Sequence, residues 1–222
     1  MELLVATLAH VAVGKDDDGP ARLRFIAETV RNAPGLVNAR FYHSREPESY
    51  YFMLATWEDE DTWYKAQDRY SPENLLRGST GELLTAPPEQ WLMHYLWGYS
   101  RPSAQPVIAA AHVVTVRQNQ ADRVERSWIE GLRRQATQPT LAFAFLARDR
   151  NEDSVLIHDP STLNNKHATT GSANIHSSNF LNLLSWPGEV EREVFYADQT
   201  YQAVSHFLNN IGAVQVLSLD PL

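Results

Sequence analysis

Cysteine is absent from this sequence of 222 residues. Its absence excludes disulfides, thiolate nucleophiles, zinc–thiolate sites and iron–sulfur clusters, because each of these requires a cysteine sulfur. Positive charge is also scarce, since 19 Lys and Arg stand against 27 Asp and Glu, for a formal net charge of −8. Nucleic acids and anionic membrane surfaces bind proteins that carry a basic patch, so neither is an expected partner.

Long apolar runs are missing as well. None approaches the ~20 residues needed to span a bilayer, and the N-terminus lacks the basic start and cleavage site of a signal peptide. The sequence also has no Gly-x-Gly-x-x-Gly or Walker A pattern, which argues against an integral nucleotide-binding domain. What is present is 43% apolar and 10% aromatic content, enough for a packed core. We therefore expect a soluble cytoplasmic protein.

An internal repeat divides the chain into two halves. Ala9-His10-Val11 lies in a β-rich run near the N-terminus, and Ala111-His112-Val113 lies in a second such run after a Pro-containing joint at 101–106. A polar turn and an amphipathic helix follow each run, over about 20–32 and about 121–136. This pattern predicts one domain over 1–104 and a related but diverged domain over 105–222.

The first half predicts a known order of elements. Strands are expected over 36–45, 50–57 and 90–99, and Asp59 is the expected N-cap of a helix that runs to about 69. The resulting β-α-β-β-α-β order is that of a ferredoxin-like unit, whose second sheet face needs a partner. The predicted fold class is therefore α+β, with tandem ferredoxin-like units that pair as an intramolecular dimeric α+β barrel.

The second half departs from this order in its middle. Strands are predicted over 141–148, 190–197 and 213–219, with a helix over 199–210. A polar segment at about 151–188 is predicted as an insertion that holds a short helix at 179–184. Its histidines, His158, His167 and His176, lack the spacing of a metal motif. We expect a solvated lid or substrate loop there and no metal site.

Three stretches of the first half resemble the antibiotic biosynthesis monooxygenase family. They are Ala33-Pro34-Gly35-Leu36, Phe41-Tyr42-His43-Ser44 and Ala55-Thr56-Trp57-Glu58-Asp59-Glu60-Asp61-Thr62-Trp63. The resemblance covers residues 3–99 well and 107–222 weakly, with Tyr196 at the expected place of the tryptophan in the second half. The fused two-unit length is similar to oxygenases that open an angucycline ring in jadomycin-, gilvocarcin- and kinamycin-type pathways.

This resemblance implies an oxygenase of aromatic polyketide biosynthesis, which uses O2 to form a quinone or to cleave a ring of a polycyclic phenol or hydroquinone. Related enzymes use a histidine, a tryptophan, a helix aromatic and a downstream arginine, which correspond here to His43, Trp57, Trp63 and Arg77. The family's asparagine, four residues before the tryptophan, is replaced by Met53. The implied cofactor is either none, without a metal, or a diffusible reduced flavin (FADH2 or FMNH2) from a separate flavin reductase.

The residues themselves suggest compatible chemistry. A deprotonated phenol passes an electron to oxygen more easily, and an imidazole with a pKa near ~6.5 can take the proton at neutral pH. His43 and His10 are the candidate bases, and Arg77 is the candidate cation for anionic reduced oxygen. Strand parity alone does not tell which histidine faces the cavity. The predicted substrate-binding residues are Trp57, Trp63, Met53, Tyr42 and His94.

Each assignment has a structural alternative. The tryptophans can be core residues, His10 and His112 can be packing residues kept in both repeats, and Arg77 can complement a helix end. Arg148 falls near the place of His43 in the second half, so one hypothesis has a single catalytic cavity, with the other structural or holding flavin. The competing functions are a non-catalytic barrel that binds a hydrophobic small molecule and a haem-binding or haem-degrading protein. The sequence leaves open whether the chain forms a homo-oligomer.

Overall fold

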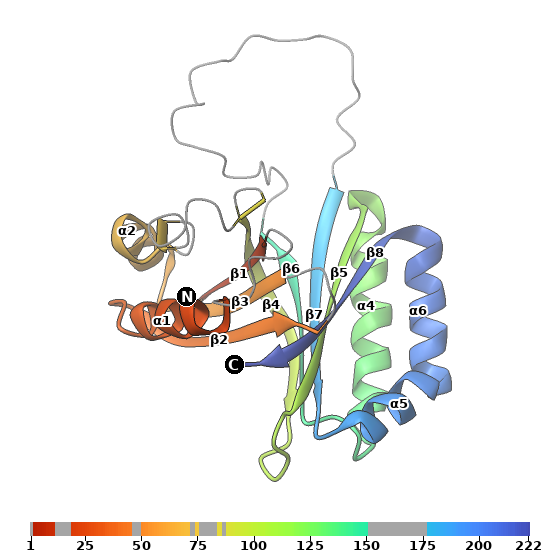
Figure 1. Ribbon diagram of the computed structural model, residues 1–222. Coiled ribbons are helices and arrows are strands. Elements are labelled where there is room, and N and C mark those ends of the chain that lie inside the picture. The colour runs from red at the N-terminus through yellow and green to blue at the C-terminus, as the bar shows by residue number, and fades with distance from the viewer. Residues whose placement is uncertain are drawn as a thin grey trace.

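The computed structural model describes residues 2–11, 19–45, 50–71, 74–75, 84–85, 88–150 and 177–222. In these residues, the strands form a closed barrel in the order β1-β3-β2-β8-β5-β7-β6-β4. Helices lie against the outside of the barrel, with one group beside each half (Figure 1). No helix among the described residues has the length and apolar character needed to cross a membrane.

The first six elements form one ferredoxin-like unit, as predicted. They are β1 (Leu3–His10), α1 (Gly19–Arg31), β2 (Leu36–Ser44), β3 (Tyr50–Trp57), α2 (Glu60–Tyr70) and β4 (Glu89–Ser100). The remaining elements form the second unit. They are β5 (Ile108–Arg117), α4 (Gln118–Gln135), β6 (Phe143–Asp149), β7 (Ser177–Trp186), α5 (Glu189–Ala197), α6 (Gln199–Ile211) and β8 (Gly212–Pro221).

The two units join at both edges of their sheets. Strand β2 pairs antiparallel with β8, and β4 pairs antiparallel with β6. Each pair therefore uses one strand from each unit, and closure satisfies the backbone groups that an open sheet edge would expose. The predicted intramolecular dimeric α+β barrel is confirmed.

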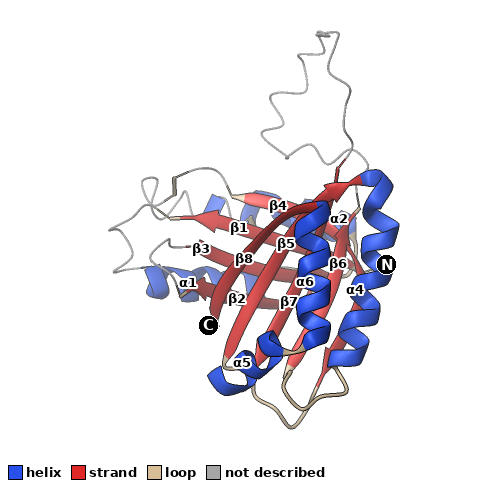
Figure 2. Ribbon diagram, turned by 90° about the vertical axis from the view of Figure 1, so that its right-hand side faces the viewer, coloured by secondary structure: helices blue, strands red, loops and turns tan. Residues whose placement is uncertain are grey.

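Side-chain alternation divides the interior into three layers. The middle layer lies inside the barrel and draws on both units, with Leu4, Phe52, Phe145, Leu183 and Leu217 among its buried residues. One outer layer lies between the N-terminal sheet and the helices α1 and α2. The other lies between the C-terminal sheet and the helices α4, α5 and α6, which cross the strands in Figure 2. Each unit thus has its own helix-covered layer.

Two predictions in the second half are wrong. Residues 179–184, predicted as a helix, lie in strand β7, and residues 190–197, predicted as a strand, lie in helix α5. Strand β7 is buried on both faces from Phe180 to Trp186, and a continuous apolar run of this kind has no period that separates strand from helix. Helix α5 contains β-branched and aromatic residues, but Val190 and Val194 are exposed whereas Phe195 is buried.

The insertion predicted at about 151–188 is too long, because strand β7 begins at Ser177. Its last part is strand β7 and the turn to α5, which are the counterparts of β3 and the turn to α2. Residues 151–176 lie outside the described part of the chain, and so do His158, His167 and His176.

Candidate functional site

The helix-facing layer of the N-terminal unit gathers several of the predicted site residues. Met53 and Trp57 project from β3 into this layer, and Trp63 joins them from α2. All three are buried. His43 lies on the same face of β2 as Phe41, which belongs to the layer, and its ring centroid is 5.5 Å from that of Tyr51.

The junction between β3 and α2 is fixed by local hydrogen bonds. The Asp59 carboxylate accepts from the Thr62 N–H at 2.8 Å and caps the helix as predicted, and these hydrogen bonds lower the pKa of that carboxyl group. Gly35 has φ +79°, and a Cβ there would lie 2.6 Å from the Thr62 Cβ. The Glu58 N–H donates to the Gly35 carbonyl at 2.8 Å. The Pro-Gly turn and the helix start are therefore packed together, which positions Trp57 and Trp63.

His43 lies where the two units meet. Its neighbours across the sheet are Tyr51 on β3 and Asp220 on β8, one from each unit. The side chain is only partly buried. Arg77, the predicted cation, lies outside the described residues.

His10 and Tyr42 face away from this layer. Tyr42 is buried in the barrel interior, and the His10 ring packs edge-on against Tyr50 at 4.7 Å between centroids. The His10 Nε2 lies 3.8 Å from a carboxylate oxygen of Glu89. Because neighbouring strand residues point to opposite faces, neither residue lines the same space as His43.

Two further pockets lie among the described residues. One, of about 360 Å³, is lined by barrel-side residues and contains Arg40, whose guanidinium carbon lies 4.0 Å from the Phe143 ring centroid. The other, of about 300 Å³, contains the exposed His94 together with Arg148 and Arg150. The predicted substrate-binding tryptophans Trp57 and Trp63 do not line this pocket.

Strand register shows which residues of the two units correspond. Leu3 pairs with Trp57, and Ile108 pairs with Trp186, so these strand ends are equivalent. Counting from them, His112 corresponds to Thr7 and not to His10. The difference of three positions reverses the face, so His112 points toward the helices while His10 points into the barrel.

The same register corrects the expected partner of Trp57. Trp186 ends β7 as Trp57 ends β3, whereas Tyr196 lies on α5. Asn182 occupies the place of Met53, because it pairs with His112 as Met53 pairs with Thr7. The second half thus carries an asparagine four residues before its tryptophan. The spacing between Asn182 and Trp186 is a feature of the sequence, but it lies within the segment that the sequence pattern predicts as an insertion.

A cavity of about 130 Å³ lies beneath the helices of the C-terminal unit. His112 is buried there, and its Nε2 is hydrogen-bonded to the Tyr201 hydroxyl at 3.1 Å. Burial lowers the pKa of His112 to about 4, and the backbone of Asn182 opposes this effect more weakly. The imidazole is therefore neutral at pH 7. The cavity is lined by His112, Trp128, Leu132, Gln135, Asn182, Leu184, Phe195, Tyr201, Val204, Ser205, Leu208, Asn209, Val214 and Val216.

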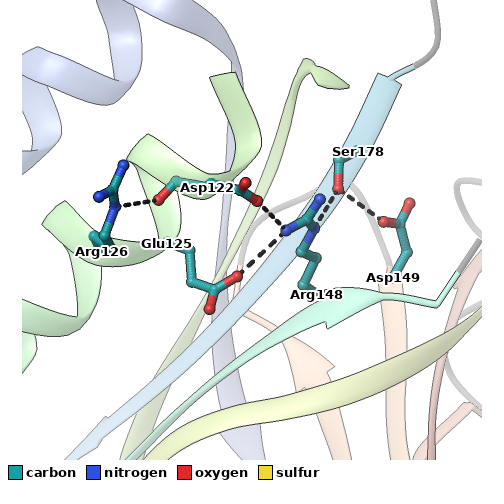
Figure 3. A network of polar contacts seen from close by, with 6 residues as sticks. All are labelled: Asp122, Glu125, Arg126, Arg148, Asp149 and Ser178. Carbon is teal, nitrogen blue, oxygen red and sulfur yellow. Dashed lines mark hydrogen bonds and ion pairs between the residues drawn. The ribbon is translucent and has the colours of Figure 1, made fainter. Parts of the chain in front are cut away.

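Arg148, which occupies the place of His43, is held in a polar network (Figure 3). Its guanidinium contacts Asp122 at 3.0 Å and Glu125 at 3.3 Å, both on α4. Its Nε donates to Ser178 at 3.0 Å, and the Ser178 hydroxyl donates to Asp149 at 3.0 Å. An arginine paired in this way cannot act as a general base, and it ties β6 and β7 to α4.

No group of three or more potential metal ligands is brought together within the described ranges. The metal-free reaction stays a prediction, as does the identity of any cofactor. The indole N–H groups of Trp57 in the first unit and Trp186 in the second are among the buried polar atoms that have no hydrogen bond to any described residue.

Comparison with known proteins finds a partial family match and several solved structures of similar fold. The family model for antibiotic biosynthesis monooxygenases matches residues 2–69, and no curated protein matches the chain. A proposed monooxygenase from Fusobacterium nucleatum has a similar structure, with a TM-score of 0.70, 8% identity, and coverage of 100% of this chain and 92% of that one. A proposed monooxygenase from Lactobacillus acidophilus gives 0.64, 7% identity, and coverage of 99% and 93%.

An anthrone oxidase-like protein is also similar, with a TM-score of 0.69, 10% identity, and coverage of 100% of this chain and 91% of that one. At these identities the structural likeness establishes the fold, while the family model supplies the sequence relationship. Both relationships agree with the β-α-β-β-α-β order of the first unit and with the closed tandem barrel. The N-terminal unit is thus similar in sequence, over residues 2–69, to the antibiotic biosynthesis monooxygenase family, and the whole chain shares the fold of these solved structures.

Proposed function

We propose that this protein is an oxygenase of aromatic polyketide biosynthesis, with its reaction site in the N-terminal helix-facing layer. Its substrate is a polycyclic phenol or hydroquinone, and O2 is consumed to form a quinone or to cleave a ring. The family match over residues 2–69 supports an oxygenase in general. The observation that carries the site assignment is that His43 lies on the helix-facing side of the N-terminal sheet, the side on which Trp57 also lies, six residues along β3 from the partner of His43.

His43 acts in this proposal as the general base. A neutral imidazole can accept the proton of a phenol and leave an electron-rich phenolate. His43 lies at the seam between the units and is half-buried, so the proposed base lies at the edge of the helix-facing layer.

The two tryptophans supply the walls for a fused aromatic ring. The buried indole N–H of Trp57 has no hydrogen-bond partner in the described chain, so it can donate to an oxygen of the substrate. Arg77 is proposed as the cation that stabilises superoxide or peroxide as negative charge develops.

The electron balance separates two forms of the reaction. Without a cofactor, a polycyclic phenol with an unsubstituted carbon para to its hydroxyl (a methylene in the anthrone tautomer) supplies all four electrons, so that one oxygen atom of O2 becomes the new carbonyl and the other leaves as water. A hydroquinone supplies only two electrons, and O2 then leaves as hydrogen peroxide without incorporation. Ring cleavage with a diffusible reduced flavin draws two electrons from the flavin, which requires a separate reductase. The same base and ring-binding walls serve either form.

The test is oxygen uptake by the purified protein with a polycyclic hydroquinone, with and without flavin, NADH and a flavin reductase. Mass spectrometry with labelled O2 identifies the incorporated atom. His43→Ala is expected to lower kcat by about 10²–10⁴-fold, the usual contribution of a general base. His206→Ala, on the exposed face of α6, is the matched control and should retain full activity.

Full activity of His43→Ala would refute the site assignment. Absence of turnover under both conditions, across several hydroquinones, would favour the non-catalytic binding barrel. The absorption spectrum of the purified protein separates these outcomes from haem binding, since haem and flavin absorb at different wavelengths.

A further inference from the structure

The C-terminal cavity contains two buried polar atoms that no described residue satisfies. They are the Nδ1 of His112 and the Nε2 of Gln135, and both side chains line the same cavity of about 130 Å³. His112 is 5% exposed and Gln135 is 4% exposed. Buried polar atoms are nearly always hydrogen-bonded in folded proteins, so two such atoms at one cavity indicate that something else occupies it.

The cavity limits the charge of its occupant. None of the described residues lining it is an Asp, Glu, Lys or Arg. Its histidine is kept neutral by burial, and the Tyr201 hydroxyl is also kept protonated because burial raises its pKa. An ion in this space would be desolvated without a counter-charge, which is strongly unfavourable. A neutral molecule is therefore required.

The cavity also limits size and shape. Its volume is close to the roughly 150 Å³ of a cavity that accepts one benzene ring, and it is far too small for the fused rings of a flavin or a polycyclic polyketide. Trp128, Phe195 and Leu208 supply apolar and aromatic walls. Asn209 and Val216 line the cavity and are exposed, so it reaches the surface between α6 and β8.

A hydroxyl group matches the two unsatisfied atoms. The Gln135 amide nitrogen is a donor, while the Nε2 of His112 is already engaged with Tyr201, which leaves Nδ1 as the remaining polar atom of the ring. A phenol hydroxyl can accept from Gln135 and donate to Nδ1, or accept from both when the tautomer is reversed.

We infer that the C-terminal cavity is a second ligand site, which binds a neutral single-ring phenol with its hydroxyl toward His112 and Gln135. This site is distinct from the proposed oxygenase site in the first unit and does not depend on it. Residues 2–69 carry the family match, so the cavity lies in the part of the chain that the match does not cover.

Calorimetric titration of the full chain with phenol, benzene and benzoate tests the inference. Phenol is expected to bind at least about tenfold more tightly than benzene, because only phenol satisfies the polar atoms. Benzoate is expected not to bind. Gln135→Leu and His112→Phe should each weaken phenol binding by about five- to tenfold and leave benzene binding unchanged or stronger.

Matched controls make the same chemical changes elsewhere. Gln215→Leu, at an exposed position of β8, and His10→Phe, on the barrel side, should leave phenol binding unchanged. NMR of the histidine rings gives a site-specific readout, since the signal that disappears in His112→Phe should shift on addition of phenol. If His112→Phe does not fold, Gln135→Leu still decides the question.

Three results would overturn the inference: no phenol binding, equal affinity for phenol and benzene, or unchanged phenol affinity in Gln135→Leu. Each would mean that ordered water satisfies the two atoms. Because the assay involves no turnover, an inactive oxygenase would leave this result intact, and a failure to bind phenol would leave the proposed oxygenase reaction intact.

Discussion

The two units have one topology but place their polar groups differently. In the N-terminal unit, the second strand supplies a histidine to the helix-facing layer and the third strand supplies Met53. In the C-terminal unit, the second strand supplies the ion-paired Arg148, the first strand supplies His112 and the third supplies Asn182. The comparison teaches that a duplicated fold keeps its tryptophan at the strand end while the chemistry around it changes.

The difference is also one of access to protons. His43 is partly exposed at the seam between the units, whereas His112 is buried and bonded to Tyr201. A general base must exchange protons, and a buried neutral imidazole instead serves as a fixed hydrogen-bonding group. This difference agrees with the proposed assignment of catalysis to the first unit and of ligand binding to the second.

The largest effects are expected when the tryptophan at the end of β3 or of β7 is replaced. Trp57→Ala and Trp186→Ala should each lower the free energy of unfolding by about 3–5 kcal/mol, because both side chains are buried. Trp57→Phe and Trp186→Phe keep most of the packing, and only Trp57→Phe should lower the turnover rate. Urea denaturation and oxygen uptake measure the two effects, and equal turnover losses in both Phe variants would contradict the division of roles.

The pH dependence of stability should carry the signature of His112. Its pKa is about 4 in the folded protein against an ordinary value of 6.5, so the unfolded chain binds the proton more readily. The stabilisation is complete above pH 6.5 and is lost as the pH falls toward 4, by about 3 kcal/mol in total.

His112→Phe should remove this contribution, so the stability difference between pH 7 and pH 4.5 should shrink relative to the unchanged protein. His206→Phe, exposed on α6, is the control for histidine removal. Urea denaturation at the two pH values measures the effect, and an equal pH dependence in both variants would show that His112 is not buried neutral.

Substitution of Arg148, the counterpart of His43, tests whether this residue stabilises the fold. Arg148→Met leaves the α4 carboxylates of Asp122 and Glu125 without their cation, and we expect a loss of about 1–2 kcal/mol, since Asp122 is well exposed. High salt should weaken the effect, because the pair with Asp122 is partly screened. Thermal unfolding at low and high salt measures it, and an unchanged melting temperature would rule out a stabilising role.

The turn from α1 to β2 at Gly35 and the turn from β7 to α5 at Gly188 should differ in their tolerance of a side chain. Gly35→Ala adds a Cβ against Thr62 at a backbone φ of +79°, and should cost at least about 1 kcal/mol. Gly188→Ala meets only the carboxylate end of the flexible Glu191 side chain and should be nearly neutral. Thermal unfolding of the two variants compares them directly, with equal melting temperatures as the contradicting result.

Much of the architecture could be predicted because it rests on local signals. The repeated Ala-His-Val runs, the Asp59 cap and the amphipathic helix near 121–136 all correspond to observed elements. Strand β7 could not be recognised, because burial on both faces removes the alternation that identifies a strand. That single error concealed Trp186 and Asn182 as the counterparts of Trp57 and Met53.

The candidate site was harder to predict because it depends on side-chain face. His10 and His43 both lie in strands of the first unit, yet their side chains point to opposite faces of the sheet. His10 points into the barrel and His43 points toward the helices. His10 and His112 share a local sequence, yet their register differs by three residues. Strand register is set by pairing with strands that are distant in sequence, so a local sequence pattern does not predict it.

The division of roles between the units is tested most directly by measuring oxygen uptake for His43→Ala and Arg148→Ala under identical conditions with one polycyclic hydroquinone. The two residues occupy equivalent positions, so the comparison changes only the unit. We predict that His43→Ala lowers kcat by about 10²–10⁴-fold, while Arg148→Ala stays within a few-fold of the unchanged protein. Comparable losses of kcat in the two variants would contradict a catalytic N-terminal unit paired with a non-catalytic C-terminal one.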